Sequence, residues 1–143
     1  MRRYLVVAHR TLGGAHLLAE VRRRRAADPY CTFHLIVPEY HPTNRTWNEH
    51  DVHLAAARTL DEMLERLAEM RIGATGEVGD ANPVYAVGAT LRREGRDAFA
   101  GIIVSTLPKG MSRWWLLDVP KRIANEYPHL TVTHLVADEA LVG

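Results

Sequence analysis

Short apolar runs that alternate with helix-period segments are the feature that most constrains the fold of this chain. Runs rich in Val, Ile and Leu are typical of strands that are buried on both faces of a sheet. The predicted strands are Tyr4–Ala8, Thr32–Val37, Ala74–Val78, Gly101–Val104 and Thr131–Ala137. Apolar residues at helical spacing predict helices near 15–25, 51–70, 83–94 and 119–126. The predicted apolar stripe of the second helix is Leu54, Ala57, Leu60, Leu64 and Leu67. This alternation indicates an α/β fold with one parallel sheet and helices on both of its faces.

The chain of 143 residues has the length of one domain, and no linker, repeat or low-complexity segment divides it. We therefore predict a single domain over residues 1–143. A net charge of +1 argues against nucleic acid as a partner, and no apolar run is long enough to cross a membrane. The lone cysteine, Cys31, excludes an internal disulfide. Together with the early end of the first apolar run, it predicts a cytoplasmic protein.

The longest irregular stretch, Pro38–Asn48, separates the second strand from the second helix. Loops of this length often act as lids or binding loops, and an exposed Trp47 would fit a lid. A tryptophan packed against the core is nevertheless the commoner arrangement. His50 and His53 could share a face of the next helix and hold a metal ion. We expect no metal site, because their spacing fixes no third ligand.

Two predicted loops lie where parallel sheets bind ligands, which is beyond the carboxyl ends of the strands. These loops are His9–Gly14, after the first strand, and Ser105–Gly110, after the fourth. Asp118, followed by Pro120, predicts the N-cap of the last helix, and Asn82 or Asp80, followed by Pro83, predicts that of the third. A strand, a loop and a helix N-terminus in this order form a natural site for an anion or a nucleotide.

Two segments carry a resemblance to a known family. Gly79–Val87, with the sequence GDANPVYAV, resembles the Gly-Asp-Pro turn and helix start of UspA-like universal stress proteins. Gly110–Leu116, with the sequence GMSRWWL, resembles their Gly-Leu-Ser-Arg-Leu-Leu-Leu segment. The resemblance extends from Tyr4 to Ala137. It implies the Rossmann-like adenine nucleotide alpha-hydrolase fold, which has three α/β/α layers and a five-stranded parallel sheet of order 3-2-1-4-5.

Members of this family commonly dimerise, so the resemblance also implies a homodimer. The predicted contact is the last strand, Thr131–Ala137. Its open edge would expose unpaired backbone groups unless a partner covers them.

The resemblance departs from the family at the nucleotide motif. Nucleotide-binding members carry Gly-x-x-Gly-x9-Gly-Ser/Thr after the fourth strand and an Asp at the end of the first. Here His9 replaces the Asp, Val104 or Ser105 the first glycine, Leu107 the second, and Leu117 and Asp118 the final pair. Side chains at glycine positions obstruct the approach of backbone N–H groups to a phosphate, and the Asp118 carboxylate repels it. We therefore predict a degenerate nucleotide site without a cofactor, and keep ATP as the less favoured alternative.

Cationic and hydroxyl side chains near this motif could still attract an anion. The resemblance and the predicted loops together define a candidate ligand site. It comprises His9, Arg10, Thr11, Val37, Ser105, Thr106, Lys109, Gly110, Ser112, Arg113 and Asp118.

The resemblance implies a non-catalytic regulatory or stress-associated protein, with a protein partner as a further expectation. Two alternatives stay open. The first is a protein that binds ATP, AMP or another anion through an altered phosphate loop. The second is a small hydrolase in which His9 activates Ser105 and Asp118 orients the histidine. No Gly-x-Ser-x-Gly elbow surrounds Ser105, so we predict that the protein is not an enzyme.

Overall fold

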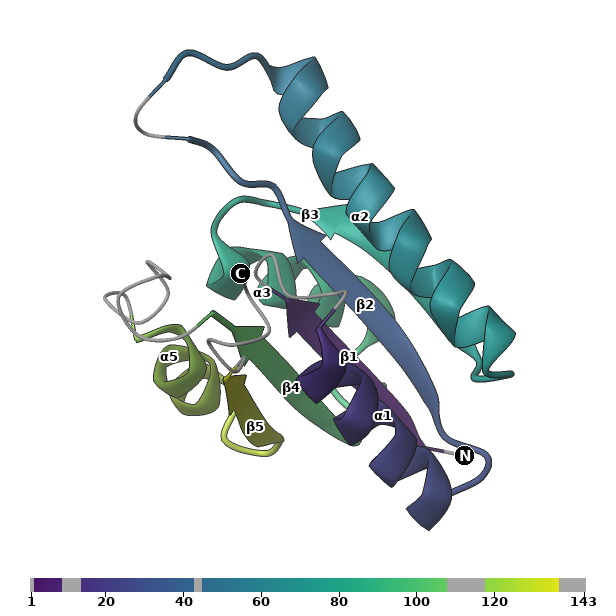
Figure 1. The fold of residues 1–143 in the computed structure, drawn as a ribbon. Coiled ribbons are helices and arrows are strands. Elements are labelled where there is room, and N and C mark those ends of the chain that lie inside the picture. The colour runs from purple at the N-terminus through teal and green to yellow at the C-terminus, as the bar shows by residue number, and fades with distance from the viewer. Residues whose placement is uncertain (1, 9–13, 43–44, 108–117, 137–143) are drawn as a thin grey trace.

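A computed structural model describes residues 2–8, 14–42, 45–107 and 118–136 (Figure 1). The strands are β1 (Arg3–Ala8), β2 (Thr32–Pro38), β3 (Ala74–Gly79), β4 (Gly101–Thr106) and β5 (Thr131–Val136). The helices in these ranges are α1 (Ala15–Ala27), α2 (Glu49–Glu69), α3 (Pro83–Glu94) and α5 (Val119–Glu126). All five strands are parallel, in the order β3-β2-β1-β4-β5. The predicted α/β fold and its strand order are confirmed.

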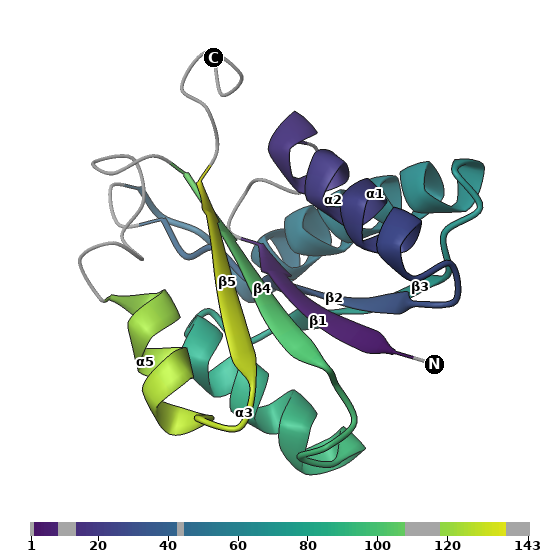
Figure 2. The same cartoon turned by 90° about the horizontal axis from the view of Figure 1, so that it is seen from below.

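The sheet lies between two layers of helices. Figure 2 shows α1 and α2 on one face and α3 and α5 on the other. One core packs Leu17 of α1 and Leu67 of α2 against the sheet, and the other packs Val87 of α3 and Ile123 of α5. The central strands are covered on both faces, which explains why their apolar runs are uninterrupted.

Helix α2 is rotated relative to its predicted orientation. The predicted apolar stripe was Leu54, Ala57, Leu60, Leu64 and Leu67, whereas the buried residues are Val52, Ala56, Leu60, Met63 and Leu67. Leu54 is 37% exposed. Both stripes satisfy a period of 3.6 residues, so the choice between them depends on packing against the sheet. The helix also begins earlier than predicted, since the Asn48 side chain accepts a hydrogen bond of 2.9 Å from the Asp51 N–H.

The two predicted helix caps have different outcomes. Asn82 caps α3, because its Oδ1 accepts hydrogen bonds from the N–H groups of Val84 (3.1 Å) and Tyr85 (3.3 Å). Asp118 stands at the N-cap position of α5, but its side chain makes no capping hydrogen bond. Its φ of 50° is left-handed, whereas a capping side chain reaches the helix from extended backbone. The prediction that Asp118 caps α5 with its side chain is therefore wrong.

The two edges of the sheet are β3 and β5. The third strand lies at an edge, as the order 3-2-1-4-5 implied. β5 is described as far as Val136, so Ala137 of the predicted strand lies outside the described residues. Within the ranges given above, no helix combines the length and the apolar content needed to cross a membrane.

Candidate functional site

Four of the predicted site residues lie in the described part of the chain. Val37 lies near the end of β2, Ser105 and Thr106 end β4, and Asp118 directly precedes α5. Since β2 and β4 both pair with β1, Val37 and Ser105 lie on either side of the end of that strand. The other predicted site residues lie outside the described residues: His9, Arg10, Thr11, Lys109, Gly110, Ser112 and Arg113.

Two imidazoles engage the hydroxyl groups at the end of β4. His16 Nε2 lies 2.8 Å from Ser105 Oγ, and His134 Nε2 lies 2.8 Å from Thr106 Oγ1. Both hydroxyl-bearing residues are buried. Burial lowers the pKa of His16 and also the pKa of His134, which favours neutral imidazoles near pH 7. Ser105 and Thr106, the two hydroxyl residues of the predicted ligand site that lie in the described ranges, therefore hydrogen-bond to neutral imidazoles.

Ser105 hydrogen-bonds to His16, whereas the hydrolase alternative pairs Ser105 with His9, which lies outside the described residues. His16 lies in the first turn of α1, and it was missed because the helical pattern already explained this segment. Its Nδ1 is buried and has no hydrogen-bond partner among the described residues, so no group there orients the ring. Ser105 itself is wholly buried. A serine nucleophile needs an oriented base and access to substrate, and the described part of the site provides neither.

Leucine and aspartate occupy two positions where the nucleotide motif has glycine or a hydroxyl residue. Leu107 directly follows β4, and its side chain is buried in the fold. Asp118 directly precedes α5, where its carboxylate would repel an anion at the helix N-terminus. The degenerate phosphate site stays a prediction that these two positions bear on.

A pocket of about 320 Å³ lies beside the end of β2, against the first turns of α2. Its walls are Val37, Pro38, Tyr40, Pro42, Arg45, Thr46, Trp47, Asp51, Val52, Ala55, Ala56 and Thr59. Val37 belongs both to this wall and to the predicted site. Trp47 is 40% exposed, so the expectation of a core-packed tryptophan is wrong at this position. The irregular stretch after β2 therefore forms part of a pocket wall.

A cluster around Glu77 was not predicted from the sequence. The Glu77 carboxylate accepts hydrogen bonds from His34 Nε2 (2.7 Å), Thr90 Oγ1 (3.2 Å) and the Arg93 guanidinium. Burial acts to raise the pKa of Glu77, but the bonds from Arg93 and His34 outweigh it, so the pKa lies below its ordinary value. Because these bonds join β2, β3 and α3, the cluster links the edge strand β3 to its neighbouring strand and to helix α3.

Metal-type ligands come together away from His50 and His53, the pair for which no metal site was expected. In the described part of the chain, ligand atoms of Glu39, His41 and Glu49 all lie within 4.8 Å of one another. His50 and His53 do not belong to this group. The sequence does not indicate this group, because Glu39 and His41 lie in an irregular stretch, where spacing does not show which side chains converge.

Comparisons with known proteins agree with the fold. No family model matches the chain, and a search of curated proteins finds no match. Among solved structures, the chain is similar to a universal stress protein that was crystallised in complex with cAMP. The two are 16% identical, the match covers 95% of this chain and 97% of that one, and the TM-score is 0.52. At this identity the similarity shows the fold, which is that of a universal stress protein.

Proposed function

We propose that this chain is a non-catalytic, stress-associated regulatory protein that binds a small ring-containing ligand rather than a nucleoside triphosphate. The observation that carries the proposal is the pocket beside Val37. It lies at the carboxyl end of β2, and parallel α/β folds bind ligands beyond the carboxyl ends of their strands. The similar universal stress protein was solved with cAMP, a ligand that has one purine ring and one phosphate. We infer a ligand of that class, a nucleoside or a nucleoside monophosphate.

The shape and lining of the pocket support a ligand of this size. Its volume of about 320 Å³ lies at the lower end of the range for small-molecule sites, which is about 300–1,000 Å³. Val37, Val52 and Ala56 supply an apolar wall for a ring. Arg45 and Asp51, also in the lining, offer one cation for a single phosphate and one acceptor for N–H or hydroxyl groups.

The end of β4 argues against a triphosphate. The hydroxyls of Ser105 and Thr106 hydrogen-bond to imidazoles, and Leu107 fills space where the motif has glycine. A triphosphate needs several backbone N–H groups and hydroxyls to solvate its charge. We therefore expect the second and third phosphates to add no affinity.

The non-catalytic part of the proposal rests on His16 and Ser105. Their hydrogen bond of 2.8 Å resembles a base and nucleophile pair, but Ser105 is wholly buried. We expect this pair to fasten α1 to β4, and Ser105→Ala to leave any trace turnover of ester substrates unchanged.

The direct test is calorimetric titration of the protein with adenosine, AMP, cAMP and ATP–Mg²⁺. We expect binding of at least one monophosphate or nucleoside, and no tighter binding of ATP than of AMP. Ala55→Leu should weaken binding at least about tenfold, because extra methylenes in a filled space cost about 1–3 kcal/mol. Ala55 lines the pocket on an exposed part of α2, so the larger side chain is compatible with folding.

Ala68→Leu is the matched control, since Ala68 is exposed on the same helix and does not line the pocket. It should bind like the wild type. ATP that bound much more tightly than AMP would contradict the degenerate phosphate site. A wild type that bound none of the four compounds would overturn the ligand and leave a scaffold for protein partners.

A further inference from the structure

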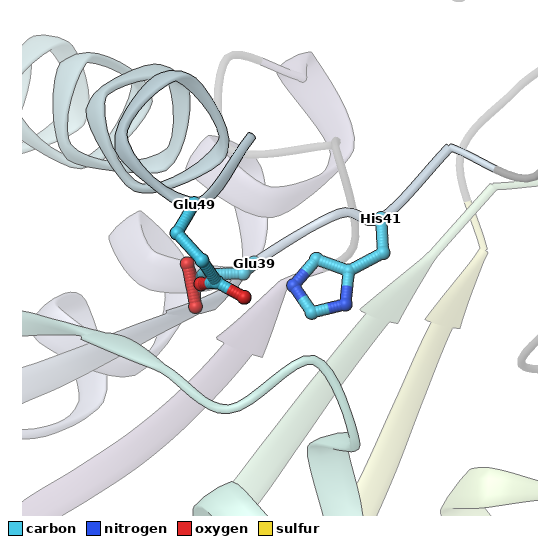
Figure 3. Close-up of side chains that lie close together, drawn as sticks. All are labelled: Glu39, His41 and Glu49. Carbon is cyan, nitrogen blue, oxygen red and sulfur yellow. The ribbon is translucent and has the colours of Figure 1, made fainter. Parts of the chain in front are cut away.

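We propose that Glu39, His41 and Glu49 form a binding site for a divalent transition-metal ion such as Zn²⁺. The three side chains come from the segment after β2 and from the first turn of α2. One ligand atom from each lies within 4.8 Å of the other two. Figure 3 shows the imidazole and the two carboxyl groups directed toward one another.

The imidazole of His41 supplies the strongest reason for an ion. Its Nε2 is buried, yet it has no hydrogen-bond partner among the described residues. A buried polar atom without a partner costs free energy that a folded protein normally avoids. A metal ion between this nitrogen and the carboxylates would satisfy it, since neutral imidazole is a common metal ligand.

The two carboxylates, of Glu39 and Glu49, are the second reason to propose a cation at this site. Within the described ranges, neither Glu39 nor Glu49 forms an ion pair with a basic side chain. Two negative charges held this close repel each other. A divalent cation would neutralise both charges.

The three ligands are also held in place by the fold. The Glu39 N–H donates a hydrogen bond of 3.0 Å to the carbonyl of Gly79, at the end of β3. The His41 ring stacks on Trp47, with ring centroids 4.3 Å apart and an interplanar angle of 18°. Glu49 lies in the first turn of α2, whose N-cap is Asn48. The backbone of both glutamates and the ring of His41 are therefore positioned before an ion binds, which reduces the entropy that binding costs.

The donor set decides the class of metal. One imidazole nitrogen and two carboxylate oxygens suit Zn²⁺ and related transition ions, whereas Ca²⁺ and Mg²⁺ prefer sites made of oxygen alone. Three protein ligands leave at least one position for water or another ligand. The ion would also link the segment after β2 to α2. Pro38, Tyr40 and Pro42 of that segment line the pocket, so metal binding should stiffen one of its walls.

The test is a titration of the chelator-treated, metal-free protein with Zn²⁺ in the presence of a competing chromophoric chelator. We expect one Zn²⁺ per chain and a higher unfolding temperature with Zn²⁺ than without it. Glu49→Gln and His41→Gln should each weaken binding at least about tenfold, because even groups behind the ligands typically contribute 10–100-fold. Co²⁺ in place of Zn²⁺ should give visible absorption bands that both variants lose.

Two exposed residues of α2 provide matched controls, His53→Gln and Glu65→Gln. Both should bind Zn²⁺ like the wild type. The proposal is wrong if His41→Gln and Glu49→Gln keep wild-type affinity and stoichiometry, or if the controls lose as much affinity. Glu49 is exposed, so Glu49→Gln separates a lost ligand from a lost fold. Circular dichroism of each variant verifies that separation.

Discussion

Two histidines hydrogen-bond to the hydroxyl groups at the end of β4. His16 and His134 reach Ser105 and Thr106 from α1 and β5, on separate elements of the fold. Each pair uses a hydroxyl that could otherwise bind an anion. The same arrangement makes the stability of the protein depend on the protonation of the two rings.

We expect the free energy of unfolding to fall as the pH is lowered from about 7.5 to 5.5. Burial lowers the pKa of both His16 and His134, so the unfolded chain takes up protons at a higher pH than the folded protein. Their contribution to stability is present above the unfolded value of about 6.5 and is lost below it. Each ring can add at most about 1.4 kcal/mol per pH unit. Urea unfolding at several pH values measures the slope.

The double variant His16→Gln/His134→Gln keeps hydrogen-bonding side chains but removes both titrating groups. Its stability should change less between pH 7.5 and 5.5 than that of the wild type. Carboxylates that titrate near 4.5 contribute little to this window. An equal slope in both proteins would contradict the assignment to these two histidines.

Close packing between elements fixes how α2 lies on the sheet. A Cβ atom added at Gly76 of β3 would lie 2.4 Å from Leu60 Cδ1 and 3.2 Å from the Leu35 carbonyl oxygen. Helix and strand therefore meet where the strand has no side chain. This contact agrees with the observed apolar stripe of α2, since Leu60 is one of its buried residues.

The N-terminus of α3 is stabilised by the side chain of its N-cap, Asn82, and substitution of this residue tests that contribution. Asn82→Ala should lower the free energy of unfolding by about 1 kcal/mol, because it leaves the N–H groups of Val84 and Tyr85 without their acceptor. Chemical denaturation measures the loss. Asn82→Gly is the control and should cost only a few tenths of a kcal/mol, because glycine is itself a tolerated N-cap. Equal losses in the two variants would show that the side-chain bonds do not stabilise the helix.

Among the described residues β5 is an edge strand of the sheet, and a contact through such an edge concerns the whole molecule. An edge strand presents unpaired N–H and C=O groups to a second chain. Val136, at the end of this strand, is also among the exposed large apolar residues. These features keep the homodimer through β5 as a prediction.

Sedimentation of the wild type should show a dimer, and Val136→Lys should raise its dissociation constant at least about tenfold, since lysine on an edge strand blocks pairing. Tyr30→Lys is the control. Tyr30 is exposed in the turn before β2, far along the sheet from β5, so the same charge should leave the dimer intact. A monomeric wild type, or equal effects of the two variants, would refute this interface.

The sequence by itself determined the alternation of strands and helices, the central position of the apolar strands and a cap for α3 at Asn82 or Asp80. Each of these depends on residues that lie close together in the chain, where period and cap chemistry act directly. The strand order came from the family resemblance, and pairing in the structure confirmed it.

Only the tertiary structure decided which polar side chains meet. His16 lies 89 positions from Ser105, and His34 lies 43 from Glu77. Glu39, His41 and Glu49 converge because an irregular segment turns back on the start of α2. No periodic pattern encodes such contacts, since they depend on how elements pack around one sheet. The site proposed for a metal was for that reason invisible in the sequence, whereas the sheet that supports it was not.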